Sequence, residues 1–157
     1  MKRHKVKILN KGLLQQVTDL CQQRGVRLTS QRQQVLELIW QQKGSSTAYE
    51  LLDKLKETEP QAKPPTVYRA LDFLLEQGFI HRVESTNSFV SCCFFDEHEC
   101  HGQHKHFSHL LICDQCGDVA ELQDDALIAL LTKNIDAHGF KLTNHVIETH
   151  GICKSCQ

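Results

Sequence analysis

The chain has 157 residues, a formal net charge of −1, 40% hydrophobic residues and 24% charged residues. These values exclude a collagen-like, low-complexity or strongly disordered chain, and they suit one ordinary domain or two small ones. The 10 His and 8 Cys exceed what packing alone requires in a chain this short, so metal binding is the first function to consider.

The small net charge conceals two halves of opposite sign. Residues 1–82 contain 14 Lys and Arg against 8 Asp and Glu, whereas residues 83–157 contain 4 against 11. The second half also holds 8 of the 10 His and 7 of the 8 Cys. This asymmetry indicates that the first half meets a polyanion and that the second half binds cations or a partner chain. It predicts two domains with different tasks.

The sequence also indicates where the protein resides. No apolar run approaches the roughly 18 residues of a membrane span, and the basic N-terminus has no apolar signal core. We therefore expect a cytoplasmic protein with no membrane partner, in which closely spaced cysteines are reduced and bind metal. The basic N-terminal arm is interpreted as solvated and mobile, with a supplementary phosphate contact as the alternative.

Four amphipathic helices are predicted in the first half from apolar residues at helical spacing. They are expected at 12–24, 29–43, 47–59 and 64–77. Gly25, Gly44 and Gly78 follow three of these segments as left-handed terminators. A capping box at Thr47 begins the third helix, and Pro64 suits the first turn of the fourth.

A β-hairpin is predicted after the fourth helix. Its strands, 79–83 and 89–94, flank the connection 84–88, with a polar turn at 86–88. Helices followed by a hairpin in this order make a winged helix-turn-helix, whose last helix lies in the major groove of double-stranded DNA. The fold class expected for the whole chain is therefore α+β, with a winged helix first and an α/β dimerisation domain after it.

Three residues of the fourth helix are candidates for DNA contact. Thr66 offers a hydroxyl, Tyr68 a ring for a thymine methyl group, and Arg69 a bidentate donor for guanine. The alternative is that Tyr68 and Arg69 only occupy the polar face of a helix whose apolar face forms core. The positive charge of the first half favours DNA binding.

Two CxxC motifs give the second half its clearest function. They contain Cys113, Cys116, Cys153 and Cys156, and 36 residues separate the two motifs. Paired knuckles of this kind supply the four thiolates of a closed tetrahedral zinc site. A redox pair and an iron–sulfur cluster are the alternatives, and a redox CxxC would need a βαβ context that its sequence neighbours do not provide.

A sheet with one helix is expected around these knuckles. Strands are predicted at 108–112, 119–122 and 145–149, and a helix follows Asp124 or Asp125. A sheet with one covering helix and an exposed edge invites dimerisation, and helix-turn-helix domains usually read two half-sites as a dimer.

The motifs together resemble the ferric uptake regulator family. The resemblance spans about 12–156 and is carried by 27–32, 65–71, 78–80, the His-rich loop 96–106, 113–117, 142–145 and 153–156. Segments 60–66 and 83–88 are most similar to the zinc-sensing branch of that family. The resemblance implies a zinc-responsive repressor that binds operator DNA as a metal-loaded homodimer and represses zinc-uptake genes.

The resemblance also implies particular sites. It places a winged helix at 1–92 and a dimerisation domain at 93–157, with one structural zinc ion at the four cysteines and one regulatory zinc ion at the hinge. The ligands implied for the regulatory ion are His81, Cys92, His106 and Glu121. The DNA contacts implied are Tyr49 and Arg69, with Thr66 and Tyr68 as phosphate or methyl contacts.

Cys92 favours zinc over iron because a mixed nitrogen, sulfur and oxygen set suits tetrahedral Zn²⁺. Iron or peroxide sensing is the alternative within the family, and zinc storage by the His-rich loop is an alternative from another class. A zinc hydrolase is disfavoured because the chain has no HExxH motif. No enzyme activity and no small-molecule substrate is expected, and a third metal site at His104, His109 or His145 stays open.

Overall fold

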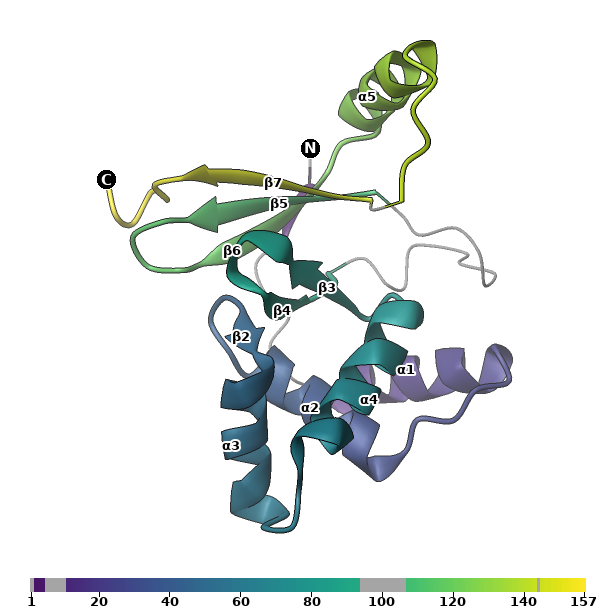
Figure 1. Ribbon diagram of the computed structural model, residues 1–157, viewed down its shortest axis with the longest axis vertical. Coiled ribbons are helices and arrows are strands. Elements are labelled where there is room, and N and C mark those ends of the chain that lie inside the picture. Colours follow the sequence, from purple (N-terminus) through teal and green to yellow (C-terminus); the bar gives the residue numbers. More distant parts are fainter. Residues whose placement is uncertain (1, 5–10, 94–106, 144) are drawn as a thin grey trace.

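The computed structural model describes residues 2–4, 11–93, 107–143 and 145–157 (Figure 1). These residues form a helical layer with a three-stranded sheet, and a four-stranded sheet from which a further helix extends. The mixed helix and sheet architecture confirms the predicted α+β class. None of the helices in the described ranges combines the length and apolar character that a membrane span requires.

The four predicted N-terminal helices are present. They are α1 (Lys11–Gln23), α2 (Ser30–Trp40), α3 (Ala48–Thr58) and α4 (Pro64–Glu76). The second helix ends three residues before the predicted end at Lys43, and Gly44 follows with φ of +93°. The capping box is confirmed, because Thr47 Oγ1 accepts from Glu50 N at 3.3 Å while Glu50 Oε2 accepts from Thr47 N at 2.7 Å.

One apolar core joins these helices and fixes the orientation of α4. Val67, Leu71 and Leu74 of α4 are at most 1% exposed. Complete burial of such a side chain contributes about 1.5–3 kcal/mol. Because that face is committed to the core, the opposite face of α4 carries Tyr68 and Arg69 outward, and both are exposed.

The wing is a three-stranded antiparallel sheet in the order β2 (Ser46–Thr47), β4 (Ser88–Ser91), β3 (Ile80–Val83). The hairpin was predicted, but β4 begins one residue earlier and ends three residues earlier than expected. A 3₁₀ turn, η1 (Glu84–Thr86), joins β3 to β4, and Asn87 follows it with φ of +46°. The strand β2 was not predicted, because two residues are too short for an alternating pattern.

The second sheet has the order β1 (Lys2–His4), β6 (Val119–Gln123), β5 (Ser108–Cys113), β7 (Val146–Gly151). The strands β5 and β7 are parallel, and the other pairs are antiparallel. Three of these strands and the helix α5 (Asp125–Ala137) were predicted, with Asp124 as the N-cap. The interpretation of the basic N-terminal arm as solvated and mobile was wrong for residues 2–4, which pair with β6. This pairing was missed because the sequence there has no alternating apolar residues.

The four-stranded sheet lies over the wing rather than over the helices (Figure 1). A small apolar cluster fills the contact, with Val83 and Val90 from the wing meeting Leu110 and Val119 from the other sheet. The helix α5 stands away from both sheets. The two sheets therefore meet at one face. One group of metal-binding side chains lies between the sheets, and the other lies at the end of the four-stranded sheet.

Candidate metal centres and DNA-contact residues

The four cysteines of the CxxC motifs converge. Cys113 and Cys116 lie at the turn between β5 and β6, and Cys153 and Cys156 lie in the segment after β7. One ligand atom from each of the four lies within 4.8 Å of the others. The parallel pairing of β5 with β7 brings the motifs together, because Cys113 is in register with Gly151. This arrangement can hold a metal ion in a closed four-sulfur site.

The protonation of these thiols is uneven without a cation. Backbone N–H groups of Cys153 and then Cys116 lower the pKa of the Cys113 thiol from 9.0 to about 6. By contrast, hydrogen bonding with Cys153 and Cys116 raises the pKa of Cys156 to about 12. One thiolate is therefore stabilised by the backbone, whereas further thiolates beside it need a cation to balance their charge.

A second cluster lies where the two sheets meet. His81 is on β3, Cys92 directly follows β4, and Glu121 is on β6. His81 Nε2 lies 2.8 Å from Glu121 Oε1, and Cys92 Sγ lies 3.9 Å from the same oxygen. All three residues are buried, and their ligand atoms lie within 4.8 Å of one another. The fourth predicted ligand, His106, lies outside the described residues.

Two further groups support this cluster, and neither was predicted from the sequence. Ser108 Oγ lies 3.1 Å from His81 Nε2, and Cys93 N donates to Glu121 Oε2 at 2.7 Å. A buried carboxylate is costly unless charge and hydrogen bonds compensate it. Nitrogen, sulfur and oxygen donors converging around that carboxylate fit a zinc ion. The cluster takes ligands from both sheets, so an ion bound there would connect them.

The other histidines that the structure describes have different surroundings. His109 on β5 bonds through Nε2 to Thr149 Oγ1 at 2.8 Å, and His145 packs edge-on against Phe107 with ring centroids 5.7 Å apart. Within the described ranges, groups of three or more metal-type side chains occur at the two clusters above. A third site that uses His109 or His145 therefore does not form from described residues alone, and His104 lies outside them.

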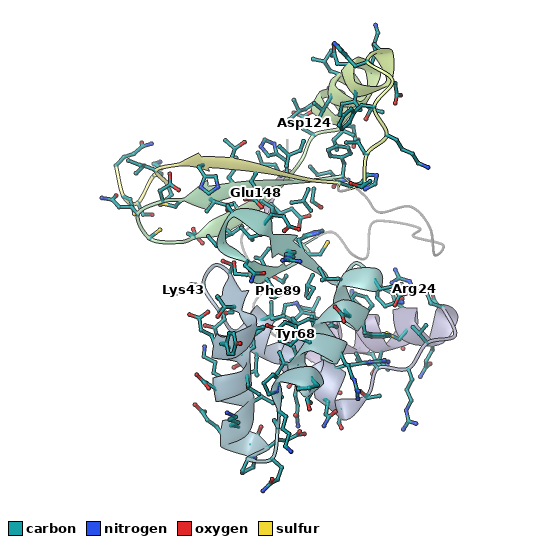
Figure 2. The ribbon with its side chains drawn as sticks, viewed as in Figure 1. Arg24, Lys43, Tyr68, Phe89, Asp124 and Glu148 are labelled. Atoms are coloured by element: carbon teal, nitrogen blue, oxygen red, sulfur yellow. The ribbon has the colours of Figure 1, made fainter. Side chains whose placement is uncertain are left out.

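The predicted DNA-contact residues lie on α3 and α4. Tyr49, in the first turn of α3, is 68% exposed, and Tyr68 on α4 is 43% exposed. Arg69 is also exposed, whereas Thr66 is half-buried. Figure 2 labels Tyr68 on the helical layer, on the far side of the wing from the four-stranded sheet. An exposed aromatic residue beside an exposed arginine on α4 suits contact with base edges and phosphates.

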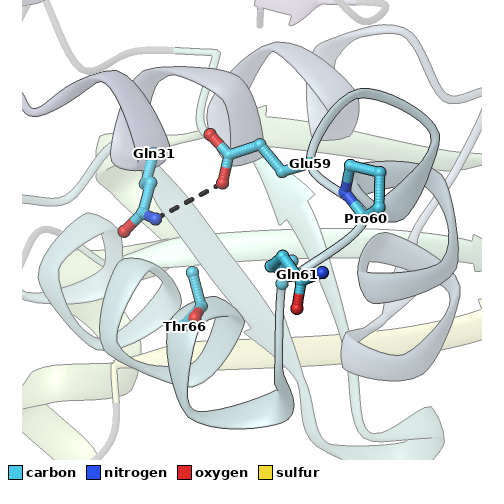
Figure 3. Close-up of a pocket in the computed structure, with 6 residues that line it drawn as sticks. Gln31, Glu59, Pro60, Gln61 and Thr66 are labelled. Atoms are coloured by element: carbon cyan, nitrogen blue, oxygen red, sulfur yellow. Dashed lines mark hydrogen bonds between the residues drawn. The ribbon is translucent and has the colours of Figure 1, made fainter.

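Thr66 also borders a small pocket between the start of α2 and the α3–α4 loop. The pocket measures about 280 Å³ and is lined by Gln31, Glu59, Pro60, Gln61, Ala62 and Thr66 (Figure 3). Gln31 Nε2 donates to Glu59 Oε2 at 3.3 Å across it. The hydrogen bond ties the start of α2 to the loop that precedes α4, so it helps to position the first turn of α4.

Comparison with known proteins identifies the family. The model of the family described as "Ferric uptake regulator family" matches residues 23–150. The chain belongs to this family. The family consists of transcription regulators, so the chain is a regulator and not an enzyme.

Relatives within the ferric uptake regulator family include zinc uptake regulators. The zinc uptake regulation protein of Escherichia coli strain K12 is 51% identical over 150 residues, which cover 96% of this chain and 84% of the relative. A solved structure of a zinc uptake regulator complexed with zinc and DNA is 51% identical and aligns with a TM-score of 0.85 over 96% of each chain.

A third relative, XcZur, has been solved in two forms. Its holo form is 39% identical and aligns with a TM-score of 0.82, covering 94% of this chain and 98% of that one. Its apo form is 40% identical, but aligns with a TM-score of 0.50 over 92% and 95% of the two chains. The elements of this chain are therefore arranged more like the holo form of that protein than like its apo form.

Proposed function

We propose that this member of the ferric uptake regulator family is a zinc-responsive repressor that binds operator DNA as a homodimer and represses zinc-uptake genes. The observation that carries the proposal is the buried cluster of His81, Cys92 and Glu121, which takes ligands from the wing and from the second sheet. The relatives described above, one of them complexed with zinc and DNA, support the same function.

The two clusters have different roles in this proposal. The four cysteines would hold a structural ion that stabilises the domain formed by 93–157. The buried cluster, with His106 as its fourth ligand, would hold a regulatory ion between that domain and the winged helix, which leaves β1 in the second sheet. A zinc ion at each cluster would supply a cation that binds these nitrogen, sulfur and oxygen ligands together. His81, Cys92 and Glu121 then hold β3, the end of β4 and β6 at one mutual angle.

That angle determines how α4 meets DNA. When His81 and Glu121 are not held together, the winged helix samples other orientations, and few of them place two copies of α4 in successive major grooves. Coupling between two sites is typically 1–3 kcal/mol, which corresponds to roughly 5- to 150-fold tighter operator binding. A switch from 1:99 to 99:1 needs about 5.5 kcal/mol, so two regulatory ions per dimer would approach a complete switch. The greater similarity to holo than to apo XcZur supports closure of this kind.

The helix α5 supports the homodimer. None of its thirteen residues is buried in the single chain, and Leu127 and Leu130 are 40% and 60% exposed. An apolar stripe of this size on a helix usually faces another protein surface. A second copy of the chain is the partner that a two-fold symmetric operator requires.

The proposal is tested by operator binding with buffered free zinc. Purified protein is titrated against a DNA fragment from a zinc-transporter promoter, with wild type compared with Cys92→Ser and with Cys93→Ser as the matched control. Cys93 is the adjacent buried cysteine, and its thiol is not in the cluster. We expect zinc-dependent binding in wild type and in Cys93→Ser, and its loss in Cys92→Ser with one zinc ion per chain retained.

Other results would favour the alternatives. A response restored only by Fe²⁺ would make the protein an iron sensor of the same family. Many weak zinc sites without operator binding, and without the steep salt dependence that phosphate contacts produce, would favour zinc storage.

A further inference from the structure

A second junction connects the two sheets, away from the buried His81–Cys92–Glu121 cluster. On one side are the turn 113–117 and the strand β7. On the other side are the loop between α2 and β2 and the turn η1. Figure 2 labels Lys43 in that loop and Glu148 on β7 above it. We call the four-cysteine site formed by both CxxC motifs and their turns the knuckle. We call the contacts between the knuckle, β7 and the winged helix the knuckle–wing junction.

The first contact joins two backbones. Gly44, in the loop after α2, is buried and has φ of +93°. A Cβ atom at Gly44 would overlap the carbonyl oxygen of Gly117. Gly117 directly follows the CxxC motif, and its own N–H donates to Cys113 O at 2.9 Å. The loop of the winged helix therefore rests against the turn that presents two of the four thiols, and only glycine fits there.

The second contact is a carboxylate that caps the wing. Glu148 Oε1 accepts from Glu84 N at 2.5 Å, and Glu148 Oε2 accepts from Ser85 N at 3.3 Å. These are the first two residues of η1, whose N–H groups have no partner within so short a turn. Hydrogen bonds to a charged acceptor are roughly twice as strong as neutral ones. Glu148 thereby fastens the turn of the wing to β7.

A third contact connects this carboxylate to the knuckle. His150 Nδ1 lies 2.8 Å from Asp114 Oδ1, and His150 Nε2 lies 3.6 Å from Glu148 Oε2. Asp114 stands between the two cysteines of the first CxxC motif, and its N–H donates to Gly151 O at 2.9 Å. A continuous set of polar contacts thus runs from the first CxxC motif through His150 and Glu148 to the backbone of the wing.

We propose that the four-cysteine knuckle is a docking surface for the winged helix, and that Glu148 is a positioning residue for DNA binding. The knuckle then has a second role besides stabilising the four-stranded sheet. Its turn contacts the α2–β2 loop and its neighbouring strand caps η1, so the orientation of α4 is fixed at two separate points. The inference rests on the proposed function, because orientation matters only if α4 contacts DNA.

Two substitutions each disrupt one contact of the junction, and neither changes a ligand of either cluster. Glu148→Ala removes the cap, and its control is Glu57→Ala, which removes an equal charge at an exposed position of α3. Gly44→Ala introduces the overlap with Gly117. Its control is Gly25→Ala, because Gly25 has a similar φ of +66° and a Cβ there meets no atom within 4 Å. Comparison of the two alanines separates the overlap from the cost of the left-handed backbone.

Five measurements are made on the zinc-loaded protein. Zinc per chain and dimer mass show whether each variant retains its metals and its assembly. Amide hydrogen exchange at 84–86 and small-angle X-ray scattering report docking without DNA. Operator affinity reports function. We expect Glu148→Ala and Gly44→Ala to keep their zinc and their mass, to exchange faster at 84–86 or expand, and to bind operator at least about fivefold more weakly, the lower end of typical coupling. Glu148→Gln, whose amide oxygen can still accept from the wing, should recover part of the loss.

The outcomes are distinguishable from failure of the proposed function. If both variants bind operator within about twofold of their controls while exchange or scattering changes, the junction does not position α4 and the inference is overturned. If exchange and scattering do not change either, the docking itself is disproved. If wild type shows no zinc-dependent operator binding, the proposed function fails, whereas exchange and scattering still decide whether the knuckle holds the wing.

Discussion

His81 Nε2 on the wing and Glu121 Oε1 on the second sheet lie 2.8 Å apart, and both side chains are at most 8% exposed. The two residues are 40 positions apart in the sequence. The contact places a histidine and a carboxylate side by side in the buried interface between the two sheets. A cation bound at this site would connect the two sheets.

Glu121→Gln should therefore remove one zinc ion and retain the other. The amide oxygen of glutamine can still accept from Cys93 N, so the fold is retained, but the charge that binds a cation is lost. We expect zinc affinity at this cluster to fall by more than the roughly 10- to 100-fold that accompanies loss of an outer-shell partner. Metal analysis after dialysis against a weak chelator should give one ion per chain, against two in wild type and in the exposed control Glu76→Gln.

Arg69→Ala should weaken operator binding and relax its sequence preference. Arg69 is exposed on the outer face of α4, where a guanidinium can contact a guanine edge. Loss of such a contact costs about 1–3 kcal/mol, whereas loss of a phosphate contact weakens binding to all sequences equally. Affinities for the operator and for single-base variants distinguish these cases. Lys141→Ala, at an exposed position after α5, removes the same charge away from α4 and should leave both affinities unchanged.

Leu130→Glu should weaken the dimer. Leu130 is 60% exposed on α5 in the single chain, and Leu127, one turn earlier on the same face, is 40% exposed. Loss of its burial in an interface costs about 1.5–3 kcal/mol, which is at least about tenfold in the dissociation constant. Sedimentation across a range of concentrations measures the change. The control is Ala129→Glu, which places the same charge on the polar stripe of the helix, and equal effects at both positions would argue against this interface.

Sequence reasoning predicted the parts of the fold that local interactions determine. The capping box at Thr47, the proline at the start of α4 and the glycines after three of the N-terminal helices act within a few residues, so a pattern in the sequence shows them. The four-cysteine metal site was predicted equally well, because two CxxC motifs have the spacing of metal ligands. The mutual positions of His81, Cys92 and Glu121 were expected only from the family resemblance, since nothing in their spacing brings them together.

The features that were missed depend on contacts between distant segments. Ser108 and Glu148 are ordinary polar residues on strands, and their partners, His81 and the backbone at Glu84, lie on the other sheet. The short strand β2 exists because β4 offers it a partner, and not because its two residues prefer an extended conformation. Local propensity has no information on such pairings, which is why the knuckle–wing junction could be seen only in the structure.

Acidification should destabilise the metal-free protein over a pH range determined by the pKa of the Cys113 thiol. In the metal-free protein the backbone N–H groups of Cys153 and Cys116 lower the pKa of this thiol from 9.0 to about 6. Its folded pKa lies below its unfolded value, so its contribution to stability is present in full above pH 9.0, shrinks as the pH falls, and is lost as the pH falls through about 6. Chemical denaturation of metal-free wild type should accordingly show lower stability at about pH 5 than at about pH 8, and Cys113→Ser should remove most of that difference.

The ionisation itself is measured by alkylation with iodoacetamide as a function of pH, followed by mass spectrometry of each cysteine peptide. We expect Cys113 to react with a midpoint of about pH 6. Cys21 is the internal control, because burial raises the pKa of its thiol and it should react only in more alkaline solution or on unfolding. Protons compete with zinc for the same thiolate, so zinc loss from the knuckle should also become steeper below that midpoint. Equal midpoints for Cys113 and Cys21 would show that the backbone donors do not preorganise the knuckle for metal.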